Sequence, residues 1–168
     1  MTDVFTKFTC AVPTRDQKAT TTAKVLVKEW FLKYGVPLQI HSDQGRNFES
    51  EVIADFMGLR RHKLHRITLK EMHRFNKTMH DLLKTLPPAK KRKWPEYLPE
   101  LLYVYNATPH SSTMYIPHFF MFGREARLPI NLLLGEDEEV DENPSNWLAT
   151  HQARLRDAYQ RAGEHLKH

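Results

Sequence analysis

The segment His41-Ser-Asp-Gln-Gly-Arg-Asn-Phe48 is the most informative part of the sequence. It follows a short apolar segment, Val36–Ile40, which is predicted to be a buried strand, and it places Asp43 where that strand would give way to a loop containing Gly45. A carboxylate at the C-terminal end of a central strand is well placed to hold a metal ion beside a substrate. The same residues also favour an ordinary turn. The octapeptide alone therefore favours the turn, and the surrounding sequence must decide between a turn and a metal site.

The segments before residue 41 predict a layered α/β arrangement. Val4–Val12 is rich in β-branched and aromatic residues, which favours a strand that ends at Pro13. Thr14 and Gln17 have the spacing of a capping box, and the helix that follows is expected to run to Tyr34 and to end at Gly35. A strand, a helix and a second strand with tight connections are typical of an α/β layer.

Length and composition restrict the class of protein. The chain has 168 residues, of which 40% are hydrophobic, so we expect one folded domain with a core. The single cysteine, Cys10, excludes an internal disulfide framework and a zinc site built from cysteine pairs. No apolar run reaches the roughly 18 residues that a membrane span needs, so we expect no membrane partner and an intracellular protein.

Charge is unevenly distributed along the chain. Residues 58–93 contain twelve Lys and Arg but only two acids, Glu71 and Asp81, whereas residues 136–142 contain six acids and no base. The basic segment is a candidate surface for phosphate groups, although a solvated face would have the same composition. The acidic segment is predicted to be a solvated linker, and Lys90–Lys93 also has the composition of a nuclear-localisation signal.

The second half of the chain is predicted to be mainly helical. Helices are expected over Leu69–Leu86, with an exposed loop at Lys90–Lys93, and over Trp94–Asn106. A short helix is expected to begin at Ile116-Pro117 and to end at Gly123. The final helix, from Asn143-Pro144, has an apolar stripe that is too sparse for a core helix, which favours packing against a partner.

Several motifs occur in an order that resembles the integrases of Ty3/gypsy-type retrotransposons. They are Thr2-Asp-Val-Phe-Thr-Lys-Phe-Thr9, Trp30-Phe-Leu-Lys-Tyr-Gly-Val-Pro37, the segment 41–50, Arg74-Phe-Asn-Lys-Thr78, Tyr105-Asn-Ala-Thr-Pro-His-Ser-Ser-Thr113 and Phe120-Met-Phe-Gly-Arg-Glu125. The resemblance covers about residues 2–135 and implies an α/β, ribonuclease H-like catalytic core. It also implies an acidic linker over 136–144 and a connector helix over 145–168. The family's first strand would precede residue 1, so we expect a core that lacks it.

The resemblance implies which residues descend from an active site. The family holds two divalent metals, Mg²⁺ or Mn²⁺, with an Asp, Asp, Glu triad. Asp43 matches the second Asp, the first lies on the strand that would precede this chain, and His73 stands at the position of the Glu. Glu71 lies two residues earlier, about 200° around a helix. Neutral imidazole is a poor replacement for a carboxylate with Mg²⁺, so we expect no productive metal binding.

The functional expectation is a protein that binds nucleic acid without cutting it. The candidate DNA-contacting residues are the cations of the basic segment: Arg60, Arg61, Lys63, Arg66, Lys70, Arg74 and Lys77. The alternatives are an active polynucleotidyl transferase, a protein-interaction module and a remnant without function. Homo-oligomerisation is also expected from the resemblance.

Overall fold

The computed structural model describes residues 1–37, 40–42, 64–66, 70–127, 133 and 144–165. These residues are mostly helical. They fall into two compact units: unit 1 comprises Met1 and Cys10–Leu101, and unit 2 comprises Thr2–Thr9 and Leu102–His168. None of the helices in the described segments combines the length and the apolar character needed to cross a lipid bilayer.

Unit 1 begins with a continuous helical segment. It consists of α1 (Ala19–Leu26), a π-helical turn η1 (Val27–Phe31) and α2 (Leu32–Tyr34), and it ends at Gly35, whose φ of 89° is open to glycine and strained for other residues. Its apolar face buries Ala23 and Trp30, and the Trp30 ring meets the Tyr34 ring edge-on at 5.0 Å. The predicted end of this helix is confirmed.

The predicted start of the helix is wrong. The residue before α1 is Lys18, and no side chain caps the helix. The Asp16 carboxylate instead accepts a hydrogen bond from the Lys18 amide at 3.1 Å. This local turn competes with helix formation, so the chain enters the helix at Ala19 rather than just after Thr14.

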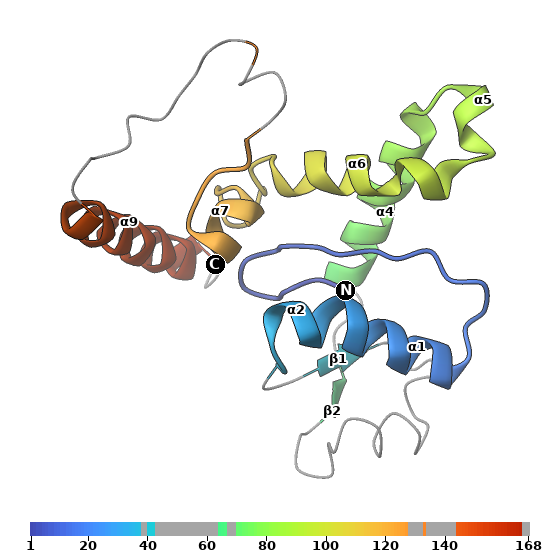
Figure 1. Ribbon diagram of the computed structural model, residues 1–168, viewed down its shortest axis with the longest axis horizontal. Helices are drawn as coiled ribbons and strands as arrows, with labels where there is room; N and C mark the ends of the chain where they lie inside the picture. The colour runs from blue at the N-terminus through green and yellow to red at the C-terminus, as the bar shows by residue number, and fades with distance from the viewer. Residues whose placement is uncertain (38–39, 43–63, 67–69, 128–132, 134–143, 166–168) are drawn as a thin grey trace. The chain divides into compact units, whose positions relative to one another are not determined.

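Two short strands of unit 1 pair in parallel. β1 (Ile40–Ser42) lies beside β2 (Leu64–Arg66), with Ile40 opposite Leu64 and Ser42 opposite Arg66 (Figure 1). The strand predicted over Val36–Ile40 therefore begins later, and Val36 is exposed. The apolar pattern of the sequence also favours a short helix over Glu49–Phe56, and both this segment and the acidic linker lie outside the described residues.

The next three helices follow the proline pattern of the sequence, and the last of them belongs to unit 1 up to Leu101 and to unit 2 from Leu102. α4 (Lys70–Thr85) ends before Pro87, and α5 (Pro88–Lys91) is a short helix where a loop was predicted, because Pro88 occupies its first turn. α6 (Trp94–Asn106) has the predicted bounds and tolerates Pro99 in its second turn. Met79 of α4 and Leu98 of α6 are buried.

Unit 2 opens with a tight turn where a strand over Val4–Val12 was predicted. The Asp3 carboxylate accepts hydrogen bonds from the Phe5 amide and from the amide and hydroxyl of Thr6, at 2.6 to 3.1 Å. Lys7 takes a left-handed φ of 63°, and Thr2 bridges Thr9 in antiparallel fashion. The prediction of one continuous strand is wrong because the Asp3 carboxylate satisfies the amides of this turn.

Two helices form the core of unit 2. α7 (Pro117–Phe122) ends at Gly123, as predicted, and α9 (Pro144–His165) packs beside it (Figure 1). Phe120 of α7 is buried with Ala158 and Ala162 of α9, and the Tyr159 hydroxyl donates to the Phe120 carbonyl at 2.8 Å. α9 therefore covers a core within its own unit, which corrects the expectation that its apolar stripe is too sparse for core packing.

Candidate functional site

In the sequence, Asp43 follows the first of the two paired strands of unit 1, and the start of α4 follows the second. Since β1 and β2 are parallel, their C-terminal ends, Ser42 and Arg66, lie at the same edge. Asp43 directly follows Ser42 in the sequence but lies outside the described residues, as do Arg60, Arg61 and Lys63.

The start of α4 is tied to the same edge by a short connection. Only residues 67–69 separate Arg66 from Lys70, so the two α-carbons are at most about 14 Å apart. Positions 71 and 73 both lie within the first turns of α4. Their helical separation is about 200°, so Glu71 and His73 occupy different faces of α4.

One face of α4 carries a stripe of basic positions. Met79 is buried, whereas the side chains of Lys77, His80, Asp81 and Lys84 are exposed. The stripe recurs at spacings of three and four residues, which is one face of a helix; its members are Lys70, His73, Arg74, Lys77, His80, Asp81 and Lys84. Three of the predicted DNA-contacting residues, Lys70, Arg74 and Lys77, therefore share one helical stripe.

One acid in the stripe is neutralised locally. Lys84 donates to the Asp81 carboxylate at 2.9 Å, and this hydrogen bond lowers the pKa of Asp81. The nearby positive charges of Lys84 and Lys77 lower the pKa of Asp81 further. The carboxylate is thus charged at neutral pH and offsets the charge of Lys84, while Lys77 is exposed beside the pair.

The basic stripe is followed by a second exposed group of cations. Lys90, Lys91, Arg92 and Lys93 are all exposed, and the Lys90 ammonium lies 4.7 Å from the centre of the Tyr97 ring. Over residues 70–93 eight basic residues stand against two acids. Lys84 and Lys91–Lys93 were not among the predicted contacts, although their position in the same basic segment could have identified them.

Asp3 has a structural role in unit 2. Its carboxylate is used by the turn of residues 3–6. Within the described ranges no three His, Cys, Asp or Glu side chains converge as metal ligands would. The predicted metal ligand Asp43 lies outside those ranges, and for His73 the structure gives only its place on α4.

A buried asparagine joins distant parts of unit 2. The Asn106 side chain donates to the Thr9 carbonyl at 2.8 Å and accepts from the Thr9 amide at 2.9 Å. Both residues are buried, Thr9 with 1% and Asn106 with 6% exposure. The Asn106 side chain thus satisfies both backbone groups of Thr9, in the way a neighbouring strand would.

The chain is similar to polyproteins of retroviruses and retrotransposons. It is 26% identical over 168 residues to the retrovirus-related Pol polyprotein from transposon 412 of Drosophila melanogaster, covering 96% of this chain and 14% of that protein. It is 32% identical over 133 residues to the Pro-Pol polyprotein of feline foamy virus, covering 76% of this chain and 11% of that protein. It is 26% identical over 134 residues to the gypsy retrotransposon integrase-like protein 1 of Bos taurus, covering 77% of this chain and 27% of that protein. No protein-family model matches the chain.

These similarities establish distant homology to the Pol polyproteins of retroviruses and retrotransposons. The chain spans about a seventh of the length of the transposon 412 polyprotein and about a quarter of the bovine protein.

Proposed function

We propose that the chain derives from the integrase core of a Ty3/gypsy-type retrotransposon and binds DNA without catalysing strand transfer. In this proposal residues 1–135 correspond to a ribonuclease H-like core, residues 136–144 to a linker and residues 145–168 to a connector helix. Support comes from the similarity to Pol polyproteins and to a gypsy retrotransposon integrase-like protein, and from the order of β1, β2 and α4.

The observation that carries DNA binding is the basic stripe of α4 together with the exposed cations after it. Phosphate contacts need only Lys and Arg side chains that are accessible and share a surface. Lys77 is exposed on that stripe, and Lys91, Arg92 and Lys93 are exposed a short distance along the chain. Arg60, Arg61, Lys63 and Arg66 are the other predicted contacts of the basic segment.

The loss of catalysis rests on the residue at the third metal-binding position. Integrases of the family use two divalent metals, which carboxylate oxygens hold. Here His73 would present an imidazole, and Glu71 lies about 200° away on α4, so neither supplies a carboxylate at that position. The residues therefore do not fit the metal pair.

Two assays on the purified chain test the proposal. In a strand-transfer assay with Mg²⁺ or Mn²⁺ and a labelled duplex, we expect no product. Strand transfer that disappears in Asp43→Asn would contradict the loss of catalysis and support the active-enzyme alternative.

The binding assay compares two charge reversals. Fluorescence anisotropy with a labelled duplex should show weaker binding for Lys77→Glu than for the unsubstituted chain. Lys24→Glu is the matched control, because Lys24 is an exposed helical lysine of α1 outside the basic segment. Equal losses for the two variants would show that net charge, and not the α4 stripe, accounts for binding.

A further inference from the structure

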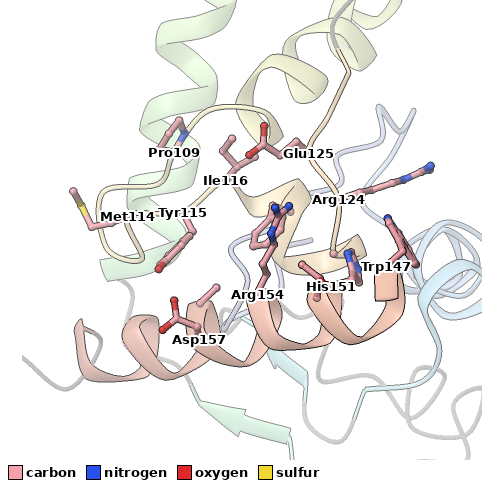
Figure 2. Close-up of a pocket in the computed structure, with 14 residues that line it drawn as sticks. Pro109, Met114, Tyr115, Ile116, Arg124, Glu125, Trp147, His151, Arg154 and Asp157 are labelled. Atoms are coloured by element: carbon pink, nitrogen blue, oxygen red, sulfur yellow. The ribbon is translucent and has the colours of Figure 1, made fainter. Parts of the chain in front are cut away.

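A groove of unit 2 stands apart from the basic surface of α4. It has a volume of about 960 Å³ and lies between the loop at residues 109–116, the end of α7 and the first half of α9 (Figure 2). Its size is that of a ligand-binding or peptide-binding cleft. Every residue that lines it belongs to unit 2.

One wall of the groove is a loop fixed by its own hydrogen bonds. The His110 carbonyl accepts from the amides of Thr113 and Met114, and the His110 amide donates to the Tyr115 carbonyl at 3.0 Å. Met114 has a left-handed φ of 61°, which is strained for a residue other than glycine, and its side chain is 64% exposed. The loop thus presents a large apolar side chain to solvent at the edge of the groove.

The opposite wall is the polar side of α9. The Trp147 ring stacks on the His151 ring with 4.7 Å between centroids and 14° between planes, and Trp147 is 47% exposed. Arg154 lies between this aromatic pair and Tyr115 in Figure 2. Among the described residues no carboxylate is within 4.0 Å of the Arg154 guanidinium, whereas Asp157 is paired with Arg161 at 3.0 Å.

The composition of the groove is that of a protein interface rather than a phosphate-binding surface. Interface cores are rich in Trp, Tyr, Met and Arg and poor in Lys. The described lining includes all four of the first group and no lysine. Two acids, Glu125 and Asp157, balance two arginines, Arg124 and Arg154, so the lining has no excess of positive charge to hold a run of phosphates, whereas a single carboxylate needs only one cation.

We propose that this groove binds a short peptide segment of a partner protein, with one carboxylate of the segment paired to Arg154 and apolar side chains on either side of it covering Met114 and Trp147. Charge complementarity sets the central contact, because Arg154 is the one of the two lining arginines that lies between Tyr115 and the Trp147–His151 pair in Figure 2. The contact is independent of the α4 stripe and of the proposed function.

Two labelled peptide pools test the docking site. Each pool consists of fluorescein-labelled dodecapeptides with random apolar residues on both sides of a fixed central position, which is Asp in one pool and Lys in the other. We expect the full chain to raise the anisotropy of the Asp pool and to bind the Lys pool about tenfold more weakly. Arg154→Glu should reverse this preference. Arg156→Glu is the matched control, since Arg156 is exposed on the same helix and does not line the groove, and it should leave the preference unchanged.

Three results would overturn the proposal. The first is that neither pool binds the full chain, and the second is that Arg154→Glu and Arg156→Glu change binding equally. The third is that a labelled single-stranded oligothymidylate competes with the Asp pool and loses binding in Arg154→Glu, which would assign the groove to nucleic acid. Circular dichroism of both variants confirms that each charge reversal leaves the helices folded.

Discussion

Replacement of Asn106 by alanine should destabilise the protein more than removal of the Asn76 side-chain amide or of the Tyr159 hydroxyl. The substitution removes both hydrogen bonds to Thr9 and leaves the amide and the carbonyl of a residue with 1% exposure without partners. A buried group left unsatisfied costs about 1–3 kcal/mol, so the two groups together lower the free energy of unfolding by about 2–6 kcal/mol. A domain of ordinary stability, about 5–15 kcal/mol, loses a large fraction of it.

The measurement is urea unfolding followed by circular dichroism, with Asn76→Ala as the matched control. Asn76 is exposed on α4, so its replacement should change stability by no more than about 0.5 kcal/mol. If Asn106→Ala were no more destabilising than Asn76→Ala, the hydrogen bonds between Asn106 and Thr9 would not hold unit 2 together.

Asn106→Asp keeps one hydrogen bond to Thr9 and loses the other when its carboxyl group is charged, so the effect of this substitution on stability should depend on pH. A carboxylate can still accept from the Thr9 amide but cannot donate to the Thr9 carbonyl, and burial raises the folded-state pKa of such a carboxyl. A group whose pKa is raised by folding contributes stability below its unfolded pKa, about 3.9, and that stability is lost as pH rises. The stability difference between Asn106→Asp and the unsubstituted chain should therefore narrow from pH 7 to pH 4. A difference that stays constant or widens on acidification would refute this reasoning.

Three further predictions concern single side chains. Gly123→Ala should lower the free energy of unfolding by about 1–3 kcal/mol, because φ is 72° and an added β-carbon would clash with the His151 imidazole, whereas the helical Gly163→Ala should not destabilise; equal effects in urea unfolding would contradict this. Tyr159→Phe should cost about 1 kcal/mol through the lost hydrogen bond to Phe120, and an unchanged urea midpoint would contradict it. Burial raises the pKa of the Cys10 thiol, so iodoacetamide should alkylate it more slowly at pH 8 than in urea; a faster native rate would contradict this.

Local sequence signals predicted the helices whose ends are marked by proline or glycine. The bounds of α6 and the Pro117 start and Gly123 end of α7 agree with prediction, because proline fits the first helical turn and glycine accepts a left-handed φ at the end. Side chains that hydrogen-bond to nearby amides caused the errors. Asp3 stabilises a turn inside a segment of strand-like composition, and Asp16 delays α1.

Features that depend on distant contacts could not be predicted from one sequence. Asn106 meets Thr9 across 97 residues, and nothing local in either segment identifies the pair. The packing of α9 was missed because Ala158 and Ala162 are small, so the stripe seemed sparse, yet both are buried with Phe120. At the candidate site, α4 and its basic stripe follow from helical periodicity, whereas Asp43 stays a prediction outside the described residues.

The salt dependence of DNA binding tests the central proposal most directly. Each phosphate neutralised by a lysine or arginine contributes about −0.9 to the slope of log K against log salt concentration. With Lys77, Lys91, Arg92 and Lys93 exposed, contact by these four residues alone corresponds to a slope of about −3 to −4 for a short duplex. Lys77→Glu should reduce its magnitude by about one. Affinity that does not change between 50 mM and 200 mM salt, the range in which phosphate contacts weaken strongly, would contradict the proposal that this chain binds DNA through the basic segment.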